Sequence, residues 1–132
     1  MIPEIIILAL TIYMESRGEP LQGKIAVGQV IQERMIEKHK SAAGVCLQRK
    51  QFSCWNIGVD EVHIRHINGE LVKNKVDKKA WRDCLQIARR VVRRSLPRGR
   101  SWNHYHSTKV NPSWSAAMKD TEIIGNHKFG RI

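Results

Sequence analysis

The chain has 132 residues, of which 42% are hydrophobic, and 23 lysines and arginines outnumber 12 aspartates and glutamates to give a formal net charge of +11. This length and apolar fraction suit a single domain over residues 1–132 with one core, and we expect no second domain. The positive charge favours polyanionic partners such as nucleic acid, anionic lipid head groups or an acidic cell envelope, and does not choose among them.

An apolar run from Ile5 to Met14 begins the chain, and a glutamate stands on each side of it. The run is shorter than the roughly 20 residues that a membrane span needs, and the opening MIPE lacks the cationic start of a secretory signal. We therefore expect a protein that begins at Met1, is made in the cytoplasm and does not insert stably into a membrane.

The same run predicts a helix over residues 3–16, because Pro3 suits a first helical turn and the residues after it are apolar on almost every side. Thr11 and Glu15 interrupt this coat on one face, where neighbouring elements should leave a cleft. A carboxyl group among apolar neighbours loses hydration, so the pKa of Glu15 should rise towards that of a general acid. The plainer alternative is that Glu15 ends a helix and pairs with Arg17 or solvent.

A second helix is predicted from Pro20 to about His39, after a stop at Gly18. Residues at helical spacing along it are apolar except for the cation Arg34. They are Val27, Val30, Ile31, Arg34 and Met35. Glu19 precedes this helix and has two open interpretations. It is either the second carboxylate of a glycosidase, roughly 5 to 9.5 Å from the first, or a first-turn glutamate favoured by the helix dipole.

Residues 40–76 show no sustained helical period and predict loops, with a short hairpin at Asn68-Gly69. Residues 78–96 predict a third helix, which Pro97 and Gly99 would end. Arginines cover its outer sides, namely Arg82, Arg89, Arg90, Arg93 and Arg94. Such a helix can lie along phosphates, so a nucleic-acid-binding module is a rival interpretation, although no zinc-finger spacing, RNP motif or GXXG loop accompanies it.

The stretch SWNHYHSTKVNPSWS predicts an aromatic, histidine-rich loop or short strand, and IIGNHKFGRI predicts a closing turn. The histidines His104, His106 and His127 raise the question of a metal, but their spacing is unspecific, so we expect neither a metal nor another cofactor. Aromatic rings suit a sugar-binding cleft equally well. The candidates are Trp102, Tyr105 and Trp114.

Three cysteines, Cys46, Cys54 and Cys84, lack the paired spacing of a zinc site. They predict reduced thiols packed as small hydrophobic side chains, with a bridge between Cys46 and Cys54 as the alternative.

The segments ESRGEP, GKIAVGQVIQERM, QFSCWN, PSWS and IGNHKFGR, in this order, together resemble the SleB-type cell-wall hydrolase family, the catalytic domain of spore-cortex lytic enzymes and related phage endolysins. The resemblance implies a mainly α fold, with α+β possible: a small lysozyme-like domain with a central buried helix and a loop or short-hairpin region. It also implies bacteriolytic cleavage of the β-1,4 bond between N-acetylmuramic acid and N-acetylglucosamine in peptidoglycan.

By this resemblance Glu15 matches the family's catalytic acid and would act alone as a lytic transglycosylase, with Glu19 as a supporting residue. The resemblance and the aromatic segment together give the expected glycan-binding residues as Gln51, Phe52, Ser53, Tyr105, His106, Asn126 and His127. The nearest alternative is a muramidase in which water attacks and Glu19, Asp120 or Glu122 serves as base. A further alternative is an amidase, which would ordinarily need a metal.

Secreted members of the family carry an export signal and often a wall-binding domain, and neither is recognised in this sequence. This fits a monomeric, antimicrobial phage endolysin that reaches the peptidoglycan of the periplasm through a holin-made lesion, and a bacterial or prophage enzyme is the alternative. The +11 charge would hold such an enzyme to the anionic cell envelope through a basic surface.

Overall fold

The computed structural model describes residues 3–48 and 75–132, so the predicted hairpin at Asn68-Gly69, Cys54 and the segment Gln51 to Ser53 lie outside the described residues. The described chain is mainly helical with a small antiparallel sheet, as predicted. Its elements are α1 (Glu4–Ser16), α2 (Leu21–Lys38), α3 (Ala42–Cys46), α5 (Lys75–Val92), β1 (His104–Ser107), the 3-10 helix η2 (Ser113–Ala117), β2 (Lys119–Ile124) and β3 (His127–Arg131).

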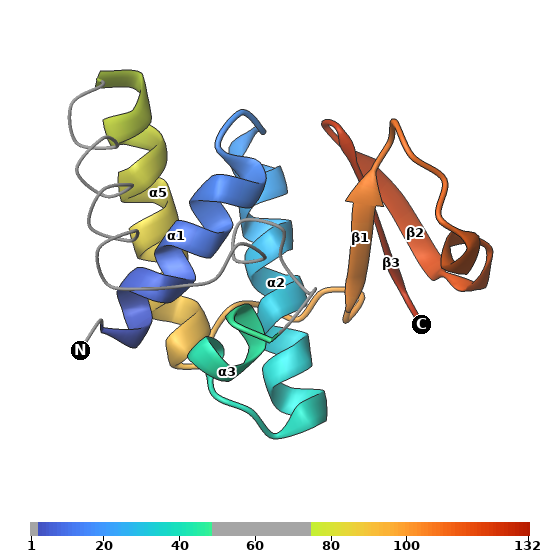
Figure 1. The fold of residues 1–132 in the computed structure, drawn as a ribbon, viewed down its shortest axis with the longest axis horizontal. Coiled ribbons are helices and arrows are strands. Elements are labelled where there is room, and N and C mark those ends of the chain that lie inside the picture. The colour runs from blue at the N-terminus through green and yellow to red at the C-terminus, as the bar shows by residue number, and fades with distance from the viewer. Residues whose placement is uncertain (1–2, 49–74) are drawn as a thin grey trace.

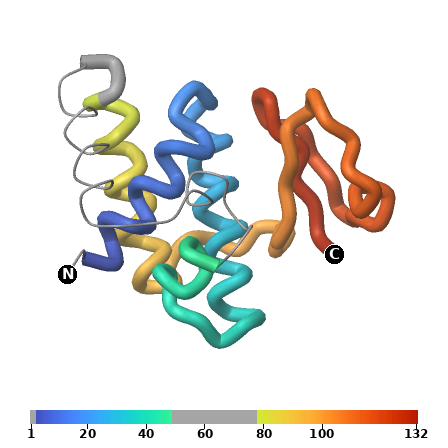
Figure 2. Tube along the Cα trace, in the orientation of Figure 1, coloured from blue at the N-terminus to red at the C-terminus, as the bar shows by residue number. Residues whose placement is uncertain are grey.

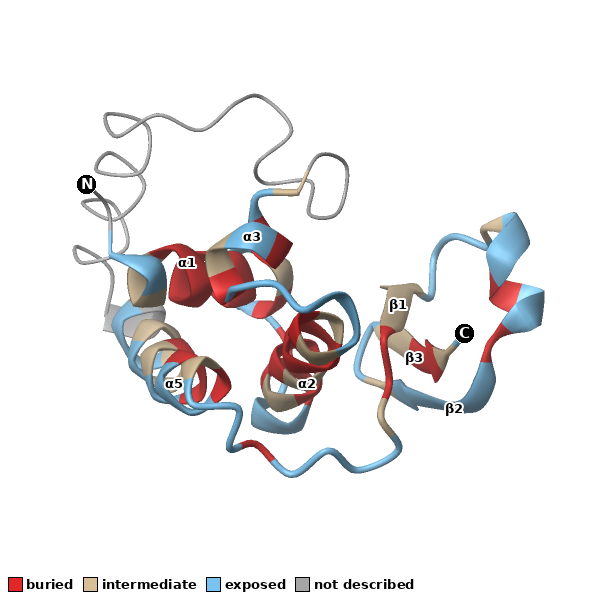
Figure 3. Cartoon of the chain, turned by 90° about the horizontal axis from the view of Figure 1, so that it is seen from below, coloured by how far each residue is buried: buried red, intermediate tan, exposed pale blue. Residues whose placement is uncertain are grey.

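Helix α1 is the central helix, and it packs against α2, α3 and α5 (Figure 1). Every residue from Ile7 to Tyr13 is buried, which is why this segment is apolar on nearly all sides (Figure 3). Thr11 is fully buried and its hydroxyl donates to the carbonyl of Ile7 at 2.8 Å, so it does not extend a polar cleft along α1 as the sequence suggested. None of the described helices is long and apolar enough to cross a membrane.

The boundaries of α1 and α2 follow the sequence signals, whereas α5 ends at Val92, before the predicted Leu96. Arg94 adopts a left-handed backbone with φ 53°, and the Ser95 N–H donates to the carbonyl of Arg90 at 2.9 Å. This early turn lets Leu96 enter the core. There the backbone N–H of Leu96 donates to Gln32 Oε1 at 3.0 Å, and Gln32 Nε2 donates to the backbone carbonyl of Leu96 at 2.9 Å. Two long-range hydrogen bonds therefore fix the end of the helix.

The sheet has the strand order β1-β3-β2 and is antiparallel throughout. After α5 the chain crosses the helices to reach β1, and the sheet lies beyond α2, away from α5 (Figure 2). Tyr105 of β1 is opposite Phe129 of β3, whose fully buried ring stacks on Trp102 at 5.4 Å. The structure thus forms a hairpin at Gly125-Asn126, where the sequence predicted a closing turn without its two strands.

Side chains of α2 fasten the sheet to the helices. Glu37 accepts hydrogen bonds from Arg131 Nη1 at 2.7 Å and from Asn103 Nδ2 at 3.2 Å. The buried Glu33 pairs with Arg98 at 2.5 Å. These contacts set the position of β1 relative to α1 and α2, and so the position of the residues that β1 carries.

Candidate active site

Glu15 lies in the last turn of α1 and is partly buried. The hydroxyl of Tyr105, 90 residues further along the chain, donates to Glu15 Oε1 at 2.9 Å. Arg17, the predicted alternative partner, places its guanidinium 5.9 Å from the centre of the Tyr13 ring. The fold therefore joins Glu15 to the first strand of the sheet.

Burial raises the pKa of Glu15 above 4.5, and the Tyr105 hydrogen bond and the charge of Arg34 oppose this rise without cancelling it. A carboxyl group in such a place holds its proton to higher pH than an exposed one, as a general acid must. The hydroxyl of Tyr105 and the cation Arg34 can still stabilise the charged form of Glu15 after it loses its proton.

Arg34 of α2 also belongs to the site, although the sequence did not mark it as a site residue. Its Nε donates to the carbonyl of Asn103 at 2.8 Å, next to the start of β1. Burial lowers the pKa of Arg34, while the nearby Tyr105 and Glu15 raise it. A cation among the apolar positions of α2 was the signal that could have identified it.

Glu19 has a different environment, because both of its carboxylate oxygens accept hydrogen bonds from one residue. Asn126 donates its backbone N–H to Oε1 at 2.6 Å and its amide Nδ2 to Oε2 at 3.0 Å. Gly125 has φ +58°, and a Cβ at this position would lie 2.6 Å from Glu19 Oε1. Glu19 therefore ties the turn between α1 and α2 to the turn between β2 and β3.

His127 lies between Tyr105 and Glu19. Its ring meets the Tyr105 ring edge-on at 5.1 Å, and its Nδ1 lies 3.6 Å from Glu19 Oε1. Burial lowers the pKa of His127, and the charge of Glu19 opposes that shift. The structure thus brings together five of the residues singled out from the sequence: Glu15, Glu19, Tyr105, Asn126 and His127.

His106 is not part of this group, because alternate residues of β1 face opposite sides of the sheet. Its Nδ1–H donates to the carbonyl of Ser107 at 2.7 Å, and its Nε2 lies 2.9 Å from the hydroxyl of Ser115. Trp114 of η2 contacts both His104 and His106, with ring centroids 5.4 Å apart in each case. His106 thus lies on the other face of β1 from Tyr105, and its expected role in glycan binding stays a prediction.

Residues 3–48 and 75–132 contain no group of three or more histidine, cysteine, aspartate or glutamate side chains that could hold a metal ion. Cys46 and Cys84 are buried free thiols, and burial raises the pKa of each to about 12. Such thiols are protonated near neutral pH, so neither is suited to nucleophilic chemistry.

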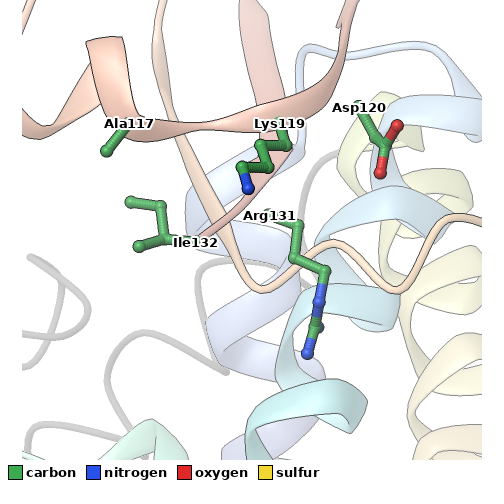
Figure 4. Close-up of a pocket in the computed structure, with 5 residues that line it drawn as sticks. All are labelled: Ala117, Lys119, Asp120, Arg131 and Ile132. Carbon is green, nitrogen blue, oxygen red and sulfur yellow. The ribbon is translucent and has the colours of Figure 1, made fainter.

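The predicted alternative bases lie on β2, which β3 separates from β1. Asp120 and Glu122 are exposed, and no hydrogen bond or ion pair joins their carboxylates to another described residue. Asp120 lines a cavity of about 380 Å³ (Figure 4). The lining residues are Ala117, Lys119, Asp120, Arg131 and Ile132, so this cavity includes neither glutamate of the α1–α2 turn.

Comparison with known proteins adds a family and a fold. The sequence model of the family described as Cell Wall Hydrolase matches residues 18–130, a stretch that includes Glu19 and Tyr105 and begins three residues after Glu15. No sequence among the curated proteins matches the chain. The crystal structure of the catalytic domain of the Bacillus cereus SleB protein superposes with a TM-score of 0.63 and 22% identity, over 97% of this chain and 89% of that one. At this identity the likeness shows a shared fold.

Proposed function

We propose that this chain, which belongs to the SleB-type cell wall hydrolase family, degrades peptidoglycan as a lytic transglycosylase with Glu15 as its catalytic acid. Family membership supports the wall-degrading activity. The role of Glu15 rests on one observation of this chain: a carboxyl group whose pKa burial raises, and which keeps one hydroxyl donor, Tyr105, on one of its oxygens.

The first step uses the protonated form of Glu15. Its proton passes to the oxygen of the glycosidic bond, the bond from that oxygen to C1 of the muramic acid residue breaks, and the glucosamine leaves as an alcohol. Tyr105 donates to Oε1, so Oε2 is the oxygen that can carry the transferred proton. Loss of the proton leaves a carboxylate that Tyr105 and the charge of Arg34 stabilise.

The second step uses that carboxylate as a base. It takes the proton of the 6-hydroxyl of the same muramic acid residue, whose oxygen attacks C1 and closes a 1,6-anhydro ring. The proton lost in the first step is thus recovered, and neither water nor a second carboxylate is consumed. Glu19 then has no chemical role, which agrees with the two hydrogen bonds from Asn126 that occupy its oxygens.

Mass spectrometry of the soluble fragments from purified peptidoglycan tests this proposal. Wild type should release fragments that end in 1,6-anhydro-muramic acid, and Glu15→Gln should release none. Fragments with reducing-end muramic acid would support the muramidase instead. In that case Asp120→Asn and Glu122→Gln, which replace exposed carboxylates of β2, would show whether either residue is the base.

A further inference from the structure

Four arginines and one lysine gather where α2 and α5 end. Arg89 and Arg90 lie in the last turn of α5, and Arg93 and Arg94 follow it. Arg94 Nη2 lies 3.5 Å from the backbone carbonyl of Lys40, just after α2, so the two helix ends meet. All five side chains are exposed, and we call these five residues the basic end surface.

This surface carries charge that the described residues do not neutralise. The ion pairs of the described chain involve Lys79, Arg98, His127 and Arg131, and none involves a residue of the basic end surface. The hydrogen bonds of Lys40, Arg90 and Arg94 go to uncharged oxygens. Protein surfaces usually intersperse both signs of charge, so a patch of one sign indicates a use for its field.

Helix stability accounts for only part of this surface. Cations in a last turn are favoured by the helix dipole, which explains Arg89 and Arg90. It does not explain Arg94, which stands at a left-handed position with φ 53° where glycine is the favoured residue. The chain therefore places a long cationic side chain at a position where local structure favours a residue without one.

The surface is separate from Glu15. Helix α1 runs opposite to α2 and α5, so the end of α1 that carries Glu15 and the ends of α2 and α5 lie at opposite ends of the helical bundle (Figures 1 and 2). Tyr105, which bonds Glu15, is on the sheet beyond α2. A polymer bound to the basic end surface would leave the catalytic group accessible.

We propose that the basic end surface binds a linear phosphate-bearing polymer of the bacterial wall and so holds the enzyme on its substrate. This inference rests on the proposed function, which brings the chain to the wall. Guanidinium groups match phosphate oxygens in pairs, and four of the five cations are arginines. The last turn of α5 carries Arg89 and Arg90, and Arg93 and Arg94 follow directly after the helix, so one linear chain can contact both pairs.

A lipid bilayer fits the surface less well. The exposed large apolar side chains of the described residues are Met14, Leu21, Leu47, Val110, Trp114, Ile123 and Ile132. None belongs to α5 or to the basic end surface. Leu47 is the nearest of them in sequence to Lys40, and its neighbour Gln48 accepts from Lys40 Nζ at 3.1 Å, so a single leucine is a small apolar anchor for a bilayer. Binding through charge alone should weaken steeply as salt rises.

Co-sedimentation with purified walls tests the proposal. Two wall preparations are compared, one that keeps its phosphate polymers and one from which they have been extracted, over about 50 to 200 mM salt. The test variant is the triple change Arg89→Gln, Arg93→Gln and Arg94→Gln. The matched control removes the same charge elsewhere on the exposed surface, by Lys78→Gln, Lys109→Gln and Lys119→Gln.

The test variant should bind polymer-bearing walls at least tenfold more weakly at low salt, and the slope of log affinity against log salt should fall by roughly 2 to 3, because three phosphate contacts are lost. The control should bind like wild type, and extracted walls should not distinguish the proteins. Equal losses in test and control variants would overturn the proposal, because net charge alone would then explain binding. Stronger competition by duplex DNA or anionic vesicles than by the phosphate polymer would also overturn it.

The same proteins separate this inference from the proposed function. Soluble glycan fragments without phosphate polymer should be cut equally by wild type and by the test variant. If wild type cuts no glycan while its wall binding depends on the arginines, the proposed function is refuted and the wall-binding role of the basic end surface is upheld. If wild type cuts glycan normally and its wall binding does not depend on the arginines, the wall-binding role of the basic end surface is refuted and the proposed function stands.

Discussion

Glu15 and Glu19 are four residues apart in sequence, and the fold gives their carboxyl groups opposite environments. Glu15 receives one hydrogen bond from a tyrosine hydroxyl, and burial raises its pKa. Glu19 is buried too, but its two oxygens accept a backbone N–H and an amide of Asn126. The comparison teaches that the number and kind of hydrogen-bond donors, as well as burial, distinguish the proposed proton donor from a carboxylate that ties two turns together.

Replacing Glu15 should have the largest effect on activity. Glu15→Gln keeps the size of the side chain and its acceptor for Tyr105 but cannot give up a proton. Peptidoglycan solubilisation should therefore fall by about 10²- to 10⁴-fold, the usual contribution of a general acid. A turbidity assay on wall suspensions measures this loss, and a variant with the wild-type rate would exclude Glu15 as the acid.

The same substitution should leave the fold intact. Because the pKa of Glu15 is raised in the folded chain above its ordinary value of 4.5, the folded state binds its proton more tightly than the unfolded state does. Wild type therefore loses stability as pH rises from that value through the folded pKa. Glutamine has no charge to desolvate, so thermal melts at pH 7 should place Glu15→Gln at or above wild type, and a lower melting temperature would contradict this linkage.

Replacing Glu19 should act on stability first. Glu19→Gln puts an amide where a carboxylate oxygen accepted from Asn126, which should lower the free energy of unfolding by about 1 to 3 kcal/mol. Denaturant unfolding measures this loss, and activity per folded molecule should stay within about tenfold of wild type. An inactive variant with wild-type stability would instead make Glu19 part of the chemistry.

The two turns that Glu19 joins offer a matched pair of glycine substitutions, Gly125 between β2 and β3 and Gly18 between α1 and α2. Gly125→Ala meets a left-handed φ of +58° and places a Cβ against Glu19 Oε1, whereas an added Cβ at Gly18 meets nothing within 4 Å. The first change should cost about 1 to 2 kcal/mol of unfolding free energy, from the backbone conformation alone. Gly18→Ala should be close to neutral, and equal melting temperatures for the two variants would contradict the described turn.

The smallest predicted effect is a shift in pH dependence. Tyr105→Phe removes the hydrogen bond that stabilises the Glu15 carboxylate, so the pKa of Glu15 should rise further. The alkaline limb of the pH–activity profile should move up on the order of one pH unit, since a hydrogen bond to a charged group contributes roughly 1.5 kcal/mol. Arg34→Gln should move it in the same direction, and a downward shift in either variant would refute this account of the site.

Local sequence signals predicted the helical part of the molecule. Gly18 and Pro20 separate α1 from α2, and a glutamate in an apolar helix marked Glu15 as unusual. The sheet was harder to predict, because β2 is exposed from Lys119 to Ile123 and so shows no alternation of apolar and polar residues. The early end of α5 was missed because contacts with Gln32, 64 residues away, determine it.

The partners of the two glutamates were predicted in type but not in arrangement. Tyr105 is 90 residues from Glu15, and Asn126 is 107 residues from Glu19, so no spacing in the sequence encodes these contacts. A tyrosine, an asparagine and a histidine were recognised as suited to a glycan site. Which of them bonds which glutamate depends on the register of β1 and β3, and strand alternation decides that Tyr105 and His106 face opposite sides of the sheet.

The most direct test of this account is an NMR titration of the Glu15 carboxyl carbon, assigned by comparing wild type with Glu15→Gln. The account predicts that Glu15 titrates above 4.5 and that its midpoint coincides with the alkaline limb of the pH–activity profile. A midpoint at or below 4.5, or an activity limb that does not follow it, would contradict the claim that Glu15 is the proton donor.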